Sequence, residues 1–448
     1  MSTTISQVME SEISASFDNM SKNIPSTEDE MNMEFNRKNI ESLNKVIRLV
    51  DSDETTGIDL FCYVHCDPTD SDIRKQCRGV VFKDDELVMK GFPYTIEYTK
   101  KMNSKDINNN IVPIFDKCSF YDSYEGALIR MFYYKDKWYL STNRKLDAYR
   151  SKWASKESFG SYFFKALVNA VDSNNELREA IGLKEGEKPS HYGSENPHNK
   201  YIEGFQNILD KNKQYMFLLL NSNENRIVCE SPTKPTMFHV GTFVNSELRM
   251  DEYIHLPYPQ ELKFSNIDEL YNYVNNVDIK KLQGVIVFAP NNIQYKIFNE
   301  QYDELYKVRG NEPSIKFRYL QVRMNKEYND ILHKLYPEYT IAFEEYENHI
   351  YDIANDILNA YKDRFIKKTY VTVPVEEFQV IRECHKWHLL DRIHNKISLS
   401  KVIDILNLQP PTNINRMIRK KISEKLKTPP NTENKNTYKH ISLLRKDK

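Results

Sequence analysis

Residues 120–147 hold the side chains of this chain that are best placed for chemistry. The segment is expected to form three strands separated by two turns, and Ser123, Tyr124, Glu125 and Gly126 lie at the first turn. A serine hydroxyl attacks well only when a general base takes its proton, and no Ser-His-Asp spacing surrounds Ser123. Taken alone, the segment is either a degenerate active-site hairpin or an ordinary turn of a β protein.

Further polar motifs accompany this hairpin in a fixed order between residues 75 and 310. Arg78 and Gly79 open an apolar strand upstream, and the segment 90–98 follows it. Downstream come 215–220, 225–228, 282–287 and 295–298. Together these segments resemble the RNA ligase branch of the covalent nucleotidyltransferase superfamily, whose hairpin pattern is Lys-x-Asp/Glu-Gly. Degenerate ligase-like proteins of this kind are found among large DNA viruses.

The resemblance implies a fold, a cleft and a chemistry. The expected fold is a nucleotidyltransferase domain of two packed antiparallel sheets. Arg78, Glu125, Gly284 and Lys296 should converge on the cleft between the sheets. In active members a lysine amine attacks the α-phosphate of ATP or GTP with Mg²⁺, because an amine can lose its proton when burial lowers its pKa.

Four positions depart from the family pattern. Ser123 stands where the nucleophilic lysine belongs, Leu218 and Gln283 stand where carboxylates belong, and Phe298 replaces the second lysine of the closing motif. A leucine offers no oxygen to a hard cation and a glutamine offers a neutral one. The motif residues that remain are Arg78, Glu125, Gly126, Asn225, Arg226, Gly284 and Lys296.

These departures predict an inactive relative that needs no cofactor. An active ligase or capping-type enzyme with a displaced lysine stays open as an alternative, and the nearest candidates are Lys117, Lys135 and Lys137. A structural or scaffold protein of a viral particle is the third possibility. A fold alone does not decide among the three.

The elements around the motifs predict an α+β protein with a helical C-terminal domain. We expect an acidic disordered tail at 1–32, the ligase-like domain at 33–312, a helical basic domain at 313–428 and a basic disordered tail at 429–448. Apolar residues at helical spacing predict helices over 34–50, Ile267–Val274 and Ile414–Leu426. Phe343, Tyr346, Ile350, Ile353, Ile357 and Tyr361 form an apolar stripe, which predicts one long core-facing helix.

The formal charge of −1 hides a basic C-terminal region. Residues 378–448 contain 16 Lys and Arg against 6 Asp and Glu, a net charge of +10. Such a patch attracts phosphates whatever the base sequence, so RNA is the expected partner, and protein partners could also use the helices and tails. The residues expected to contact nucleic acid crowd one helix: Arg416, Arg419, Lys420, Lys421 and Lys425.

Other features narrow the class of protein. The sequence contains no run of about 18 apolar residues, so we expect neither a membrane span nor a membrane partner. We also expect no signal segment. Six irregularly spaced cysteines suit a reducing compartment, which is host cytoplasm, or a virion, if the protein is viral. Two Cys/His groups do not have the paired spacing of zinc sites, so no metal is expected: Cys62, His65, Cys66 and Cys77, and Cys384, His385, His388 and His394.

Overall fold

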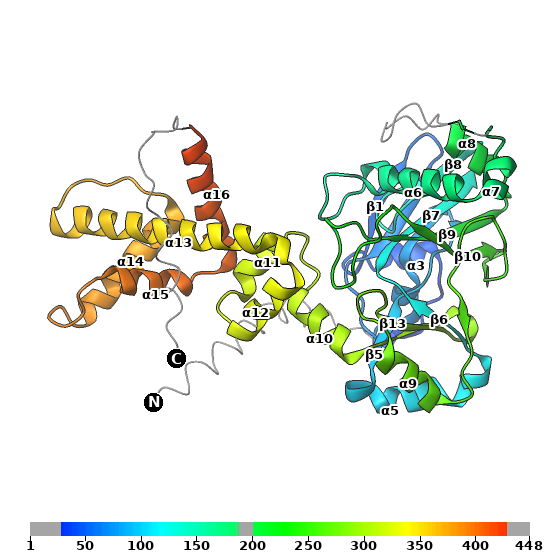
Figure 1. Ribbon diagram of the computed structural model, residues 1–448, viewed down its shortest axis with the longest axis horizontal. Helices are drawn as coiled ribbons and strands as arrows, with labels where there is room; N and C mark the ends of the chain where they lie inside the picture. The colour runs from blue at the N-terminus through cyan, green and yellow to red at the C-terminus, as the bar shows by residue number, and fades with distance from the viewer. Residues whose placement is uncertain (1–27, 185, 188–199, 428–448) are drawn as a thin grey trace. The chain divides into compact units, whose positions relative to one another are not determined.

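The computed structural model describes residues 28–184, 186–187 and 200–427, with the side chains of 425–427 left aside. The chain divides into two compact units, Met1–Glu304 and Leu305–Lys448, and the division falls within α10 (Glu300–Arg309). Most of the two predicted tails therefore lies outside the described residues. Figure 1 shows the sheets of the first unit and the helices of the second.

The described part of the first unit contains three sheets. One has four strands in the order β1-β2-β3-β4, all antiparallel. Its strands are β1 (Ile47–Asp53), β2 (Ile58–Tyr63), β3 (Arg78–Lys83) and β4 (Glu86–Met89). The short helices α3 (Arg37–Ser42) and α4 (Asp72–Gln76) flank this sheet, and apolar side chains from α3, α4 and the strands share one core cluster.

The second sheet carries the middle of the predicted hairpin. Its order is β11-β10-β9-β7-β8. The strands are β7 (Gly126–Tyr134), β8 (Lys137–Ser141), β9 (Lys213–Leu220), β10 (Met237–Val244) and β11 (Glu247–Arg249). Helices α6 (Phe159–Ser173), α7 (Asn175–Ala180) and α8 (Lys200–Asn207) pack on it, because their apolar faces share one core with inward side chains of β7 and β9.

The third sheet holds the ends of the remaining motifs. Its order is β12-β6-β13-β14-β5, with strands β5 (Thr95–Thr99), β6 (Ser119–Ser123), β12 (Glu261–Leu262), β13 (Gly284–Phe288) and β14 (Gln294–Phe298). Helices α5 (Lys100–Asn110) and α9 (Ile267–Asn276) cover one face. The helix predicted at Ile267–Val274 is thus confirmed. The short 3₁₀ turns of this unit are η1 (Val112–Lys117), η2 (Ala148–Arg150) and η3 (Pro290–Asn292).

The predicted α+β class with antiparallel sheets is confirmed, and the structure differs from the prediction of two sheets in two details. The described residues form three sheets, and β5 pairs with β14 in parallel. A tight hairpin forces antiparallel pairing, whereas strands joined by a long connection are free to run parallel. Nearly two hundred residues separate Thr99 from Gln294, so no turn fixes the direction of β5.

The N-terminal expectations also need correction. Residues 28–32 are not a disordered tail, because α2 (Glu28–Met31) places the buried Glu30 carboxylate against the Arg74 guanidinium, with oxygen–nitrogen distances of 3.1 Å. The helix expected over 34–50 ends at Ser42, and Ile47 begins β1. Pairing of β1 with β2 fixes this segment as a strand, although its apolar spacing suits a helix.

The second unit is helical, as predicted. Its core joins apolar side chains from α11 (Ile315–Val322), α12 (Lys326–Leu335), α13 (Thr340–Tyr361), α14 (Val375–Leu390), α15 (Leu399–Asn407) and α16 (Pro411–Lys427). Two short turns, η4 (Pro337–Tyr339) and η5 (Lys362–Ile366), flank α13. The predicted stripe is confirmed on α13, where Phe343, Ile350 and Ile357 are fully buried. The helix predicted over Ile414–Leu426 is confirmed as part of α16.

Candidate functional site

Strand register brings the centre of the hairpin motif to the closing motifs. Ser123 on β6 lies opposite Gly284 on β13, and Gly284 lies opposite Phe298 on β14. Gly284 has φ +148°, and a Cβ there would lie 2.0 Å from the Ile297 carbonyl oxygen. Glycine is therefore required for β13 and β14 to approach at this point.

A chain of four hydrogen-bonded side chains occupies the nucleophile position. Ser123 Oγ donates to Gln283 Oε1 at 3.0 Å, and Gln283 Nε2 donates to the Tyr302 hydroxyl oxygen at 2.6 Å. The Tyr302 hydroxyl in turn donates to Glu125 Oε2 at 3.1 Å. All four side chains are buried. Burial and the Glu125 charge raise the pKa of Tyr302 far above its usual value, so its hydroxyl keeps the proton that it donates.

Glu125 holds the loop that follows β9. Its two carboxylate oxygens accept the backbone N–H groups of Ile227, Val228 and Cys229 at 2.5, 2.9 and 3.0 Å. Asn221 Nδ2 donates to the same carboxylate at 3.1 Å. A carboxylate with this many donors is bound firmly to the protein, because hydrogen bonds to a charged acceptor are the stronger ones. The surviving motif glutamate therefore acts as an anchor for residues 221–229.

Arg78 and Lys296 reach the same region from other strands. Arg78 donates to the Pro93 carbonyl oxygen and to Thr95 Oγ1, both at 3.2 Å. Lys296 lies opposite Glu97 in the parallel pairing of β14 and β5. Burial lowers the pKa of Lys296, and the charges of Glu97 and Glu125 oppose that shift while Arg78 adds to it. The structure therefore brings together Arg78, Ser123, Glu125, Gln283, Gly284 and Lys296.

Leu218 and Gly126 lie at the rim of this cluster. Leu218 on β9 pairs with Leu128 on β7 and with Phe238 on β10, and its Cδ1 approaches the place of a Cβ at Gly126 within 3.1 Å. The Asn225 side chain bonds within its own loop, because its Oδ1 accepts hydrogen bonds from the backbone N–H and the hydroxyl of Ser222. The two retained loop residues, Asn225 and Arg226, thus follow the strand that carries Leu218.

These residues do not fit a Mg²⁺ ion. Leu218 has no oxygen, the Gln283 carbonyl already accepts the Ser123 hydroxyl, and Glu125 already accepts five donors. A hard cation needs several free oxygen ligands. Leu218, Gln283 and Glu125 therefore lack the free oxygen ligands that a catalytic Mg²⁺ ion needs.

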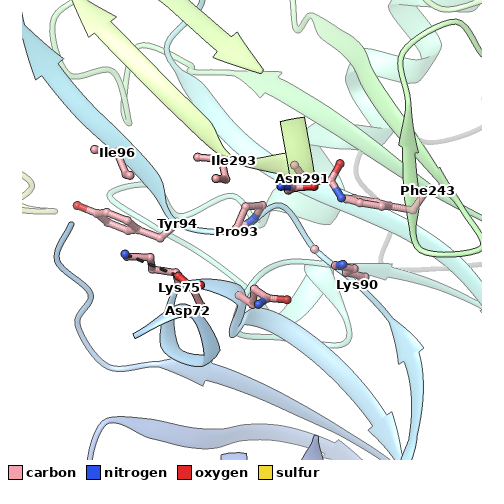
Figure 2. A pocket seen from close by; sticks show the side chains of 12 residues that line it. Asp72, Lys75, Lys90, Pro93, Tyr94, Ile96, Phe243, Asn291 and Ile293 are labelled. Atoms are coloured by element: carbon pink, nitrogen blue, oxygen red, sulfur yellow. Dashed lines mark ion pairs between the residues drawn. The ribbon is translucent and has the colours of Figure 1, made fainter. Parts of the chain in front are cut away.

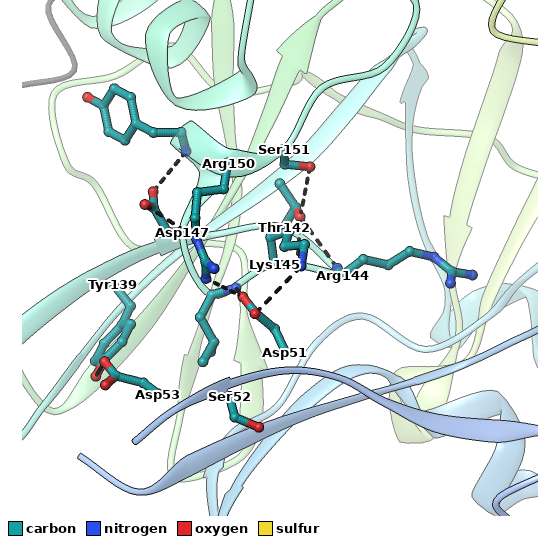
Figure 3. A network of polar contacts seen from close by, with 12 residues as sticks. Asp51, Ser52, Asp53, Tyr139, Thr142, Arg144, Lys145, Asp147, Arg150 and Ser151 are labelled. Atoms are coloured by element: carbon teal, nitrogen blue, oxygen red, sulfur yellow. Dashed lines mark hydrogen bonds and ion pairs between the residues drawn. The ribbon is translucent and has the colours of Figure 1, made fainter. Parts of the chain in front are cut away.

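The displaced-lysine candidates lie away from Ser123. Lys135 and Lys137 are at the far end of β7, where Lys135 Nζ donates to the Thr56 carbonyl and Lys137 Nζ lies 2.8 Å from Asp53. A nine-residue strand spans roughly 30 Å. Figure 3 shows Asp53 beside Tyr139 at that end, next to the ion pair of Asp51 with Arg150. Lys117 ends η1 on the far side of β6 and is exposed.

The two Cys/His groups have other partners. Cys62, Cys66, Cys77 and Cys384 are buried as free thiols. His385 stacks on Phe365 with ring centroids 3.8 Å apart, His388 Nδ1 lies 2.7 Å from the Asn395 carbonyl oxygen, and His394 pairs with Asp391. Across the described ranges, no group of three or more His, Cys, Asp or Glu side chains is placed to hold a metal ion.

One cavity of the first unit lies near β3 but is not lined by the cluster. It measures about 270 Å³ and is lined in part by Lys75, Lys90, Tyr94 and Asn291 (Figure 2). Lys75 Nζ lies 4.0 Å from an Asp72 carboxylate oxygen. The charges of the side chains that line this cavity are therefore partly balanced by one another. None of the predicted site residues lines the cavity.

The predicted basic residues on α16 separate into two kinds. Arg416, Arg419 and Lys420 are exposed, and Arg416 has only an exposed contact of 3.6 Å to Glu376. Lys421 is different, because its side chain is 22% exposed and is hydrogen-bonded to Asp356 on α13. The side chain of Lys425 lies outside the described residues. Three of the five predicted contacts are therefore exposed to a ligand.

A cavity of about 490 Å³ adjoins these arginines and was not predicted. Phe317 from α11 and Tyr346 from α13 line it together with Arg416 and Arg419. These aromatic residues lie between 70 and 102 positions before the arginines, so no local pattern in the sequence signals the association. Only the packing of α16 against α11 and α13 brings the four side chains together.

The chain is similar to several viral proteins, and no family model matches it. It is 27% identical over 395 residues to the immediate-early protein ICP-46 homolog of Invertebrate iridescent virus 6, covering 82% of this chain and 81% of that protein. It is 26% identical over 320 residues to the immediate-early protein ICP-46 of Frog virus 3 (isolate Goorha), covering 67% and 72%. None of the helices in the described ranges is long and apolar enough to cross a membrane.

Ligases appear among both the sequence relatives and the solved structures. An Autographa californica nuclear polyhedrosis virus protein, named for a bifunctional polynucleotide kinase/RNA ligase, is 23% identical over 284 residues, which cover 60% of this chain and 36% of that protein. An archaeal ATP-dependent RNA ligase superposes with a TM-score of 0.32 at 10% identity, covering 84% and 74%. A Naegleria gruberi RNA ligase gives 0.29 at 9%, covering 51% and 66%. Among the sequence relatives, the viral proteins and the one named for an RNA ligase confirm the predicted likeness.

Proposed function

We propose that this protein is a catalytically inactive, ligase-like protein that binds RNA and acts as an adaptor in viral RNA handling, in the host cytoplasm or the virion. One observation carries the inactive part of the proposal. The hydrogen-bonded chain from Ser123 through Gln283 and Tyr302 to Glu125 occupies the place where a nucleophilic lysine and its carboxylates belong. A serine there cannot form a lysyl phosphoramidate.

The test is incubation of the full chain with labelled ATP or GTP and Mg²⁺, followed by denaturing electrophoresis. We expect no covalent protein–nucleotide adduct. A stoichiometric, acid-labile adduct that disappears when one lysine is replaced would overturn the proposal.

A working nucleotidyltransferase is the second candidate, and Lys296 is the observation that favours it. It is the lysine that the structure brings to the cluster, and burial lowers its pKa, which favours the nucleophilic amine. Lys296→Arg distinguishes the candidates, because an adduct lost in this variant would identify Lys296 as the nucleophile. The proposed inactive protein shows no adduct in either form.

The exposed basic residues of α16 support the RNA-binding part. Replacing Arg416, Arg419 and Lys420 with glutamine should weaken RNA binding and lower the slope of log K against log salt by about 2 units, because each lost phosphate contact removes about 0.7. A matched control is the triple glutamine variant of Lys386, Arg392 and Lys396, which are exposed residues of the same unit that do not line the α16 cavity.

The control variant should retain the affinity and salt dependence of the parent. Equal losses in both triple variants would mean diffuse attraction without a site. Parent-like binding by the α16 variant would leave the protein-recruiting adaptor or the scaffold role as the better explanation.

A further inference from the structure

The cavity beside α16 combines a volume suited to a ligand, a positive charge and aromatic side chains. It measures about 490 Å³, within the range of roughly 300–1,000 Å³ that suits small organic ligands. Its lining comes from α11, α13, α16 and the segment before α11. The residues are Glu312, Ser314, Phe317, Tyr346, Thr412, Asn415, Arg416 and Arg419.

Its positive charge has two sources. Arg416 and Arg419 contribute guanidinium groups, and Glu312 is the single acid among the residues that line the cavity. The beginnings of α11 and α16 also lie at the cavity wall, where Ser314 and Thr412 are placed. Backbone dipoles add positive potential at a helix start. An anion with several oxygens, such as a phosphate, is the complementary group.

Its aromatic side chains give the cavity a second preference. Phe317 and Tyr346 are half-buried, so the surrounding core holds each ring in place. Burial raises the pKa of Tyr346, which therefore keeps a neutral hydroxyl and a ring suited to stacking. Lys316 Nζ lies 5.7 Å from the centroid of the Tyr346 ring. A simple phosphate ion would not stack on either ring, whereas a nucleobase stacks on an aromatic ring whatever its identity.

We propose that this cavity binds one nucleotide of single-stranded RNA, with the phosphate at Arg416 and Arg419 and the base against Phe317 and Tyr346. Asn415 and Thr412 supply amide and hydroxyl groups for the base or the ribose. A duplex is a poorer ligand, because its bases are already stacked and paired. The inference rests on the proposed RNA binding and adds the form of RNA and the residues that select it.

The test is fluorescence anisotropy with the full chain and a ten-nucleotide poly(A) RNA, a duplex of the same length, and free AMP as competitor. The double variant Phe317→Leu/Tyr346→Leu keeps the apolar volume and removes the rings. We expect it to bind the single strand about 5- to 100-fold more weakly, since stacking of one base typically contributes that much, and to bind the duplex like the parent. Tyr346→Phe should retain the parent's affinity.

The outcomes separate the two proposals. If the parent binds no RNA at all, the proposed function fails, and this inference fails with it. If the parent binds RNA and the double variant binds the single strand equally well, with an unchanged melting temperature, only the cavity assignment is overturned. Competition by AMP at least as strong as by the oligonucleotide would also overturn it, because the cavity would then serve a free nucleotide.

Discussion

Replacing Glu125 with glutamine should release the loop that this carboxylate holds. A glutamine presents one acceptor oxygen and one NH₂ group, so one of the two oxygen positions becomes a donor. The less costly orientation puts the NH₂ group at the Oε1 position. The Asn221 amide can turn to follow it, but the Ile227 N–H loses its only acceptor on this side chain. The other orientation would confront Val228, Cys229 and Tyr302 with a donor.

The magnitude follows from these contacts. The lost hydrogen bond from the half-buried Ile227 N–H to this charged oxygen costs about 1.5–3 kcal/mol, and the bonds that remain become neutral ones and weaken. The combined loss is about 3 kcal/mol. At 1.4 kcal/mol for each factor of ten, the amides of Ile227, Val228 and Cys229 should exchange their hydrogens about 100-fold faster. Hydrogen exchange read at these amides is a better measure than global unfolding, because it reports on this loop directly and does not require two compact units to unfold in one step.

Glu230→Gln is the matched control. It makes the same chemical change one residue beyond Cys229, where the side chain is exposed and contacts Lys280 at 2.9 Å. Exchange at 227–229 should then differ little from the parent. If Glu125→Gln accelerates exchange there by less than threefold, the carboxylate does not hold the loop, and the account of the site is wrong.

Three further changes test other parts of the structure. Gly284→Ala should lower the free energy of unfolding by about 2–4 kcal/mol, because the new Cβ would lie 2.0 Å from a backbone oxygen. The control Gly182→Ala, where the Cβ meets open space, should lower it by about 1 kcal/mol. Equal melting temperatures of the two variants would contradict this expectation. Glu30→Gln should cost about 3 kcal/mol in urea titrations, because it removes one of the two carboxylate charges that face the buried Arg74 guanidinium. A parent-like midpoint would contradict the importance of this ion pair. Burial and the Asp356 charge raise the pKa of Glu377 to about 7, above its usual 4.5, so the parent should lose stability as pH rises from 4.5 to 7 and then level off. Glu377→Gln removes that loss, so its advantage in melting temperature should grow between pH 5 and pH 8, and a constant difference would refute the assignment.

The sequence predicted those parts of the site that the pairing of motif strands brings together. The motif order implied that Glu125 and Gly284 would converge, and β6, which ends two residues before Glu125, pairs with β13 at Gly284. It did not predict that Tyr302 would link Gln283 to Glu125, because that tyrosine follows the last recognisable motif. The partners of Glu125 were also missed, since backbone N–H groups leave no signature in residue types. The parallel placement of β5 and the strand at Ile47 depend on distant pairing, which local apolar spacing cannot specify.

The cleft and the α16 cavity differ in what a ligand would have to displace. In the cleft, a ligand must break buried hydrogen bonds such as those from Ser123 to Gln283 and from Tyr302 to Glu125, and each broken bond leaves a group that costs about 1–3 kcal/mol. At the cavity, Arg416 is 69% exposed, and its 3.6 Å contact with the half-buried Glu376 contributes less than about 1 kcal/mol. A phosphate replaces that contact at little cost. Under the proposed function, this difference favours RNA binding at the α16 cavity over binding at the hydrogen-bonded cluster around Glu125.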